Sequence, residues 1–288
     1  MSDRTLEVRL AYTVMSPEVE IRQPLAYPAP FGEALRRLAA IGYDGVELQV
    51  GSPRDFPVQQ VADLLREHGL AISALATGPM GAQGASLCDP DPERRQQVVA
   101  DLQVLVDHAA TLGTRVSFGR IMDGAANPGR SREERLATTA GSLRELADYA
   151  ASREVGLLVE PQCSESTDLV NTVDTALELI AGVGRPHIDV IADTFHLDLT
   201  HGSAEQGIRA SGDRLGHVQF GDNPGRGRPG TGALPFEKII GALADLGYQG
   251  WITLEHAQDA GERTAELSFD YVNRLTSATH TKEPQHVR

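Results

Sequence analysis

The chain has 288 residues, a length near the upper limit for one hydrophobic core. Its 26 basic and 40 acidic residues give a net charge of −14. This acidity argues against a nucleic-acid partner, because nucleic-acid binders gain much of their affinity from basic residues. No apolar run approaches the roughly 18 residues that a membrane helix needs, so we expect no membrane partner. The two cysteines, Cys88 and Cys163, form no C-x-x-C motif, and the first residues do not resemble a signal peptide. Both features favour free thiols and a cytoplasmic protein.

Hydrophobic periodicity predicts strands and helices that alternate along the chain. The predicted strands are Val8–Val14, Gly45–Val50, Leu70–Ala76 and Thr114–Gly119, then four more that end at Glu160, at Asp193, near Gln219 and at Glu255. The predicted helices are Phe31–Ile41, Val58–His68, Pro92–Leu112, Ser131–Glu154, Leu169–Ala181, Ala204–Ser211, Phe236–Leu246 and Glu262–Leu275. Eight right-handed β/α units close a parallel barrel, so we predict an α/β fold, a (β/α)8 TIM barrel forming a single domain over residues 1–288. An open doubly wound sheet is the alternative, but no G-x-G-x-x-G motif follows the first strand.

Two long loops and a polar tail interrupt this alternation. The first loop holds four prolines between the first strand and the first helix. Such a loop is typical of a lid or a subunit contact, and we expect a homo-oligomer. The second loop, Thr77–Asp91, contains three glycines and two prolines and is predicted to be a mobile cover. Residues 276–288 are polar and are predicted to form a frayed tail.

Four apolar runs in the second half of the chain each lead to a side chain that can bind a metal. These side chains are Glu160 in GLLVEP, Asp193 in HIDVIADTFH, Gln219 in LGHVQFGDN and Glu255 in GWITLEH. Their spacings of 33, 26 and 36 residues each fit one β/α unit. Side chains at the carboxyl ends of parallel strands converge on one face of a barrel. Three carboxylates meeting there would repel one another without a cation, so the pattern predicts a divalent metal site with oxygen ligands.

The segments VEP, DTFH, GHVQFGDNPGRGRPGTG and LEH resemble the xylose-isomerase-like TIM barrels, specifically the hydroxypyruvate isomerase and ketose 3-epimerase branch of the sugar isomerase/epimerase superfamily. The likeness is sharp from about Glu160 to Glu255. It implies that the four side chains above bind one Mn²⁺, Mg²⁺ or Co²⁺ ion and that the two glutamates also act as acid and base. It further implies that His196 and Arg226 contact the substrate. Glu47, near the end of the second strand, is predicted either to reach the pocket or to have a packing or loop-anchoring role.

Two details of the resemblance concern the metal and the substrate. Epimerases of this branch usually carry His at the position of Gln219, whereas hydroxypyruvate isomerases resemble this chain in having Gln. A carboxamide oxygen also suits Mg²⁺ or Mn²⁺ better than Zn²⁺. Relatives commonly continue the strand-five glutamate as Pro-Ile-Asn, while this chain has Pro161-Gln162-Cys163, which leaves the substrate open.

Together these features predict a metal-dependent isomerase or epimerase of a small sugar or hydroxy-keto acid. The cation would stabilise the enediolate that forms when a proton leaves the carbon beside the carbonyl, and the two glutamates would remove and return that proton. Three alternatives stay open. A dehydratase of a cyclic polyol ketone, such as inosose or dehydroshikimate, would use the same metal. An apurinic-endonuclease-like barrel would need a histidine-rich three-zinc cluster, and a non-catalytic sugar-binding barrel would need no paired glutamates.

Overall fold

A closed barrel of eight parallel strands forms the centre of the molecule. The computed structural model describes residues 6–19, 24–123 and 129–278. The strands follow one another around the barrel in chain order, and β1 pairs with both β2 and β8. The strands are β1 (Arg9–Met15), β2 (Gly45–Gln49), β3 (Ala71–Ala76), β4 (Val116–Phe118), β5 (Leu157–Val159), β6 (Ile188–Asp193), β7 (Leu215–Phe220) and β8 (Trp251–Leu254). The predicted (β/α)8 barrel is therefore confirmed.

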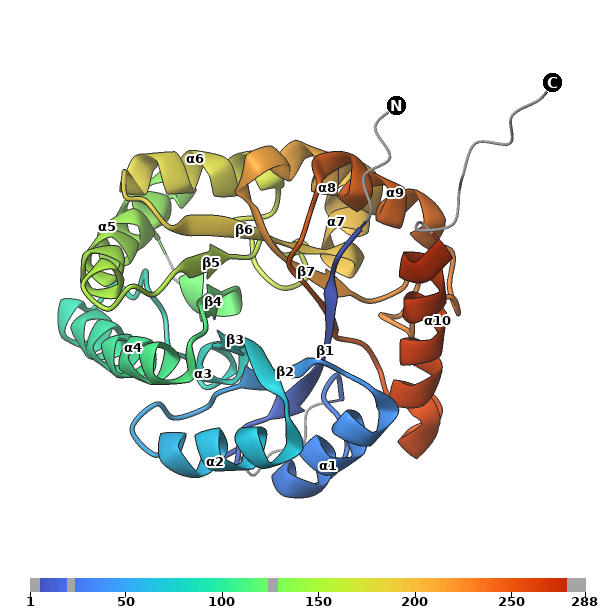
Figure 1. Cartoon of the computed structure of the whole chain (residues 1–288). Coiled ribbons are helices and arrows are strands. Elements are labelled where there is room, and N and C mark those ends of the chain that lie inside the picture. Colours follow the sequence, from blue (N-terminus) through green and yellow to red (C-terminus); the bar gives the residue numbers. More distant parts are fainter. Residues whose placement is uncertain (1–5, 20–23, 124–128, 279–288) are drawn as a thin grey trace.

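Helices form a ring around these strands (Figure 1). The α-helices are α1 (Phe31–Ile41), α2 (Val58–His68), α3 (Gly78–Ala82), α4 (Pro92–Leu112), α5 (Arg132–Ala151), α6 (Val173–Val183), α7 (Thr194–His201), α8 (Ala204–Ser211), α9 (Phe236–Leu246) and α10 (Thr264–Ala278). Short 3-10 turns cover Arg120–Met122, Gly212–Arg214 and Gly261–Arg263. No helix in the described ranges is both long and apolar enough to cross a membrane.

The two longest helices begin and end at strong local signals. In α4, the Asp91 side chain accepts a hydrogen bond from a backbone N–H of the first turn, and the helix stops at Gly113, whose φ of 67° is left-handed. In α5, Ser131 and Glu134 form a reciprocal capping box. Such caps satisfy backbone groups that have no partner inside the helix, so they fix where each helix starts.

The barrel has an apolar outer core and a partly polar interior. The main hydrophobic core lies between the strands and the surrounding helices, while Ala74, Leu158 and Ile191 form a small separate cluster. Ser73 Oγ lies 3.1 Å from Thr253 Oγ1, which lies 3.0 Å from a ring nitrogen of His217. Because β3 and β8 are not neighbours, the first of these contacts crosses the barrel. Buried polar groups are tolerated where they find such partners.

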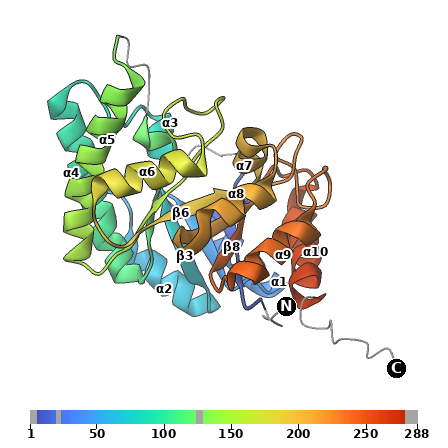
Figure 2. The same ribbon diagram turned by 90° about the horizontal axis from the view of Figure 1, so that it is seen from above.

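Several segments differ from the sequence prediction. The expected loop Thr77–Asp91 contains helix α3 and buries Met80, Leu87 and Cys88, so it is a packed segment and not a loose cover. Figure 2 shows α3 and α7 on the same side of the barrel. Helix α6 begins at Val173, four residues later than expected. Helix α10 continues to Ala278, so the first three residues of the expected tail are helical, and residues 279–288 lie outside the described residues. Both cysteines are buried and remain thiols, as predicted.

Candidate active site

The four side chains predicted to bind a metal lie at the carboxyl ends of four consecutive strands. Asp193 is the last residue of β6 and Gln219 is the fifth residue of β7, while Glu160 and Glu255 directly follow β5 and β8. All are largely buried, with exposed fractions of 8% for Glu160, 0% for Asp193 and 2% for Gln219. Ligand atoms of Glu160, Asp193 and His196 lie within 4.8 Å of one another. The barrel thus brings together residues that are far apart in sequence.

Arg226 connects two of these carboxylates. Its Nη2 donates to Asp193 Oδ2 and, at 2.7 Å, to Glu255 Oε2. Its side chain is only 14% exposed, and its guanidinium carbon lies 5.1 Å from the centre of the Phe195 ring. Burial opposes the positive charge of Arg226, but the neighbouring carboxylates outweigh it and raise the arginine pKa. The guanidinium therefore stays charged and partly neutralises the acidic site.

Asp222 holds the loop that carries Arg226. This carboxylate is fully buried and accepts hydrogen bonds from the backbone N–H groups of Asn223, Gly230, Gly232 and Leu234 at 2.8–3.0 Å. Asp222 and Gly227 also exchange two backbone hydrogen bonds across the loop. The glycines and prolines around Arg226 are therefore part of an ordered loop and not of a solvated turn.

The amide of Gln219 has a fixed orientation. Its Nε2 donates to Glu47 Oε1 at 2.9 Å, which leaves its Oε1 directed elsewhere. That Oε1 is buried and has no hydrogen-bond partner among the described residues. An orphaned buried carbonyl oxygen costs free energy, and a cation would satisfy it. The donor set of three carboxylates and this oxygen therefore fits a divalent ion with hard ligands.

Glu47 lies behind Gln219 and not in the cavity lining. Its side chain has no exposed surface, and its Oε2 lies 3.1 Å from His217 Nε2. His217 in turn contacts Thr253, as described above. These contacts give Glu47 a positioning role for Gln219, and that Glu47 also binds substrate stays a prediction. His217 is a hydrogen-bonded residue of the barrel interior.

His196 is buried beside Glu160. Its Nδ1 accepts a hydrogen bond from the backbone N–H of Cys163 at 3.2 Å, and its Nε2 lies 3.7 Å from Glu160 Oε1. Nε2 also lies 3.3 Å from Arg226 Nη1, so the donors of Cys163 and Arg226 compete for the single acceptor nitrogen of the neutral ring. Burial lowers the pKa of His196 to about 4, with Asp193 opposing and Arg226 and Arg120 assisting the shift. At neutral pH the ring is therefore uncharged.

Both glutamates have pKa values well above the usual range. For Glu160 burial is the main cause, and the negative charges of Asp193 and Glu255 add to it. For Glu255 burial raises the pKa to about 8 against the opposing charge of Arg226, with Glu47 and Asp193 adding to the rise. A carboxyl group with a pKa near 8, such as that of Glu255, can both take up and release a proton near neutral pH.

These groups border two adjoining small cavities of about 160 and 50 Å³. Both cavities are lined by Gln49, Gly78, Arg120, Gln162, Arg226 and Glu255. Gln162 Nε2 donates to Glu160 Oε2 at 2.9 Å. A side chain at Gly119 would collide with both of these groups, so glycine is needed there. Gln49, Arg120 and Gln162 were not predicted as site residues, although Gln49 and Arg120 stand within two residues of strand ends.

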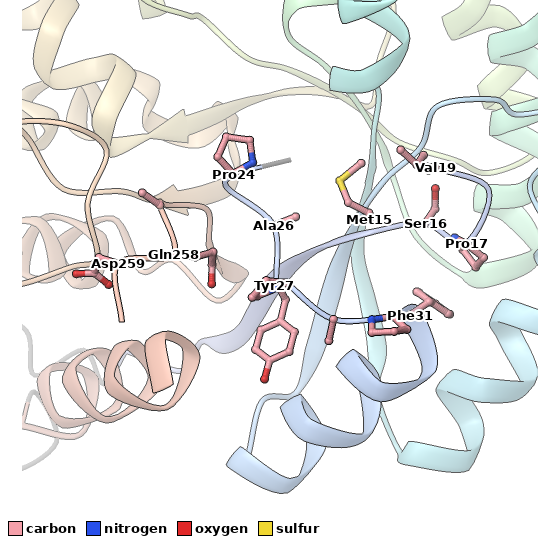
Figure 3. A pocket seen from close by; sticks show the side chains of 14 residues that line it. Met15, Ser16, Pro17, Val19, Pro24, Ala26, Tyr27, Phe31, Gln258 and Asp259 are labelled. Atoms are coloured by element: carbon pink, nitrogen blue, oxygen red, sulfur yellow. The ribbon is translucent and has the colours of Figure 1, made fainter. Parts of the chain in front are cut away.

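A larger cavity lies beside this site and not around it. It has a volume of about 720 Å³ and is lined mainly by the segment between β1 and α1 together with residues 257–259. In Figure 3, Pro24, Ala26 and Tyr27 lie in the middle of the view, with Gln258 and Asp259 to the left and Met15 and Phe31 to the right. Ala26 also lines the smaller cavity that Glu255 borders, so the two spaces adjoin. Because Glu160 and Glu255 border the smaller cavities, we treat those cavities as the candidate active site.

Comparison with known proteins agrees with this arrangement. The chain is 30% identical over 224 residues to an L-ribulose 3-epimerase from Methylomonas sp., covering 77% of each protein. It is 26% identical over 226 residues to hydroxypyruvate isomerase from Escherichia coli, covering 76% of this chain and 85% of that enzyme. The solved structure of 3-keto-D-glucoside 4-epimerase from E. coli has the same fold, with a TM-score of 0.79 at 21% identity over 93% of this chain and 100% of the other.

The relatives are thus sugar epimerases and hydroxypyruvate isomerases, the branch that the sequence motifs indicated. A family model described as the xylose isomerase-like TIM barrel matches residues 35–275, which includes seven of the eight strands and all four predicted metal ligands. The barrel, the residues at its carboxyl end and this match lead to one conclusion: the chain belongs to the xylose isomerase-like TIM barrel family.

Proposed function

We propose that the protein is a divalent-metal-dependent isomerase or epimerase of small sugars or hydroxy-keto acids. One observation carries the proposal: two largely buried carboxyl groups, Glu160 and Glu255, border the same small cavity from different strands. The reaction requires two such groups, because a proton is removed from one position and delivered to another. The activities of the relatives support the same reaction class.

The metal would be held by Glu160, Asp193, Gln219 and Glu255. These ligands suit Mn²⁺ or Mg²⁺, with Co²⁺ also possible for such a set. When bound, the ion supplies a positive charge that stabilises negative charge developing on the substrate oxygens. The buried, unpartnered Oε1 of Gln219 supports this assignment. Among the described residues, one cluster of acidic, histidine or cysteine side chains is compact enough for an ion, and it contains two of these ligands, Glu160 and Asp193, together with His196.

The two glutamates perform the proton transfer. One removes a proton from the carbon beside the substrate carbonyl, and the other returns it. Return to the opposite face of the same carbon gives epimerisation, whereas return to the adjacent carbon gives isomerisation. Gln162 holds Glu160 by a hydrogen bond to Oε2, and Arg226 holds Glu255. These contacts fix each carboxylate relative to the cavity.

His196 and Arg226 bind the substrate in this proposal. The uncharged ring of His196 lines the larger of the two small cavities, so it can form a hydrogen bond with a substrate hydroxyl group. Arg226 lines both small cavities and can donate to a substrate oxygen with a guanidinium nitrogen that is not held by a carboxylate. Both groups also exclude water from the carboxylates by covering them.

Substitution of each glutamate tests the proposal. Glu160→Gln and Glu255→Gln keep the shape and one oxygen donor but remove the basic group, so each should lower turnover by roughly 10²-fold or more. Turnover is measured with Mn²⁺ on a panel of ketoses and keto acids, with NMR identification of the products. In D₂O the wild type should incorporate deuterium at the carbon beside the carbonyl. Glu178→Gln, an exposed change on α6, serves as the matched control.

Two results would contradict the proposal. If both variants retained near wild-type turnover while still holding metal, the two-glutamate mechanism would be wrong. If the products had lost water relative to the substrates, the protein would be a dehydratase of the same family.

A further inference from the structure

Arg120 is the second arginine in the lining of the two small cavities. It stands two residues after the end of β4, and its side chain is exposed. It lines both small cavities together with Glu255. No carboxylate of residues 6–19, 24–123 or 129–278 forms an ion pair with it, whereas Arg226 pairs with both Asp193 and Glu255. Arg120 is thus a charged donor at the cavity with no protein acceptor among the described residues.

The charges in the site give Arg120 a specific role. Arg226 offsets one of the three carboxylate charges of Glu160, Asp193 and Glu255. A divalent cation would offset the other two. A fourth carboxylate, Glu47, lies behind Gln219 and accepts hydrogen bonds from the amides of Gln219 and Gln49. The positive charge of Arg120 remains in the cavity lining, where no described carboxylate forms an ion pair with it. An arginine in this position gains most from an anionic group on the ligand, because charge-assisted hydrogen bonds are about twice as strong as neutral ones.

Arg120 is also placed by packing. A side chain on Gly81, in helix α3, would come within 2.9 Å of the Ile121 backbone nitrogen and 3.2 Å of Arg120 Cγ. Glycine at this position therefore makes room for the stem of Arg120 against α3. A side chain on Gly119, the residue before Arg120, would come within 2.4 Å of Gln162 Nε2 and of Glu160 Oε2. Glycine at this position therefore allows the backbone before Arg120 to lie close to these two groups. The base of the side chain is held between two elements, while its charged end borders the cavity.

We infer that the substrate carries a carboxylate and that Arg120 binds it, so that the preferred substrate class is small hydroxy-keto acids and not neutral ketoses. The inference rests on the proposed function, because it identifies the group that the same site recognises beside the reacting carbons. A guanidinium can pair with a carboxylate through two parallel hydrogen bonds. The carboxamide nitrogens of Gln49 and Gln162 donate to carboxylates of the site, and their oxygens can accept hydrogen bonds from uncharged hydroxyl groups of the substrate.

The cavity favours a carboxylate over a phosphate ester. A phosphate group carries up to two negative charges near neutral pH, and the site already contains three carboxylates. One unpaired arginine balances one charge. The small volumes of the two cavities, about 160 and 50 Å³, also favour a substrate of a few carbon atoms. Arg120 is therefore a residue that determines specificity, and it lies apart from the two glutamates that transfer the proton.

Three-carbon substrates that differ in one group test this inference. The three compounds share a hydroxy-ketone and differ in the remaining group. Hydroxypyruvate carries a carboxylate, dihydroxyacetone a hydroxymethyl group, and dihydroxyacetone phosphate a phosphate ester. We would measure kcat and KM for each with the Mn²⁺-loaded full chain. The proteins compared are the wild type, Arg120→Gln, Arg120→Lys and the control Arg94→Gln, which changes an exposed arginine on α4. Binding of D-glycerate and glycerol by calorimetry adds a measurement that needs no turnover.

The wild type should prefer hydroxypyruvate. Arg120→Gln should raise KM for hydroxypyruvate and weaken glycerate binding by roughly tenfold to a hundredfold, because a charged hydrogen-bond donor is lost. Its kcat should change little, since Arg120 does not touch the proton-transferring glutamates. Dihydroxyacetone turnover and glycerol binding should be unaffected. Arg120→Lys should recover part of the loss, and Arg94→Gln should behave as wild type.

Other results would overturn the inference. Equal losses for acidic and neutral substrates in Arg120→Gln would make its role structural, and a preference for the phosphate ester would assign a different anion. Efficient epimerisation of neutral ketoses with no effect of Arg120 would overturn the inference and leave the proposed function intact. If no substrate reacted, the proposed function would fail, and glycerate binding would decide the role of Arg120 separately.

Discussion

Gln219 combines a fixed amide with an unsatisfied oxygen. Glu47 accepts a hydrogen bond from the amide N–H of Gln219. If the amide rotated by about half a turn, Glu47 would lose this donor. Its Oε1 therefore stays directed away from Glu47 and unpartnered among the described residues. Leaving a buried acceptor unpaired costs about 1–3 kcal/mol, and such a cost persists where it serves a function. The amide is thus held ready for a ligand with a positive charge.

The Gln219→His substitution tests this role. An imidazole nitrogen in place of a carboxamide oxygen should shift metal preference from Mn²⁺ and Mg²⁺ towards Co²⁺ and Zn²⁺. Competition calorimetry with pairs of these ions measures the shift. Gln162→His makes the same chemical change in the same cavity, at a residue that bonds Glu160 and is not a proposed ligand. An equal shift in both variants would remove Gln219 from the set of metal ligands.

At the level of single residues, the sequence predicted the residues that stand at strand ends. Glu160, Asp193, Gln219 and Glu255 follow apolar runs at β/α spacing, and this periodicity is visible without coordinates. Asp222 was missed because its partners are backbone N–H groups up to twelve residues away, which leave no pattern in the sequence. Arg120 was missed for a different reason. Its importance depends on which carboxylates pair with other cations, and only the folded arrangement determines that.

The loop between β7 and α9 is an element whose conformation depends on one carboxylate. Asp222→Ala leaves four backbone N–H groups without their acceptor and should lower the free energy of unfolding by about 2–4 kcal/mol. Arg226 would lose its support, so kcat/KM should fall as well. Urea unfolding and steady-state kinetics measure the two effects. Asp213→Ala, an exposed change in the 3-10 turn before β7, is the control and should alter neither.

Asp222→Asn separates positioning from stability. The carboxamide keeps the size of the side chain and one acceptor oxygen, but its NH₂ group faces N–H donors. The variant should therefore remain folded and still show an increased KM, because Arg226 is displaced. If the Asp222→Asn protein were less stable but had the kcat and KM of the wild type, the loop would be structural and would not position Arg226.

Helices with strong end signals were predicted well, while helices defined by tertiary packing were not. Helix α4 has its expected bounds because Asp91, Pro92 and Gly113 are local signals. Helix α3 was missed, since GPMGA has low helix propensity and forms where it packs against the 3-10 turn after β4. Helix α6 was started too early at Leu169, an apolar residue buried in the preceding loop. The true start has a readable cap, because the Thr172 side chain accepts from the N–H of Thr175.

On the scale of the whole molecule, stability should depend on pH in two opposite ways. Burial lowers the pKa values of His196 and His256 to about 4, so the unfolded chain binds more protons than the folded one between about pH 4 and 6.5. Stability is therefore lost as the pH falls through this range, by up to about 3 kcal/mol for each histidine. Burial and neighbouring charges raise the pKa of Glu160 and of Glu255, the latter to about 8. Stability of the metal-free protein is therefore lost as the pH rises from about 4.5 to 8.

Above pH 6.5 the glutamate effect should act alone. Urea unfolding of EDTA-treated protein should show a fall in the free energy of unfolding between pH 6.5 and 8. With Mn²⁺ present the fall should disappear, because binding of the ion favours the charged carboxylates. Below pH 6.5 the histidine effect should appear with or without metal, and His256→Gln should reduce its slope. A stability that is independent of pH between 6.5 and 8 without metal would contradict the raised pKa of Glu255.

The barrel also distributes its tasks unevenly along the chain. The proposed metal ligands and proton-transferring groups come from the ends of β5 to β8, whereas Gln49 reaches the cavity from the end of β2, and Pro79 and Arg120 reach it from the segments after β3 and β4. Exchange of the first half between relatives could therefore change the accepted substrate while the reaction stays the same. The hydrogen bond between Glu47 and Gln219 joins the two halves and would have to be inherited with either one. His196 and Arg226, in the second half, would limit how far such an exchange can change the substrate.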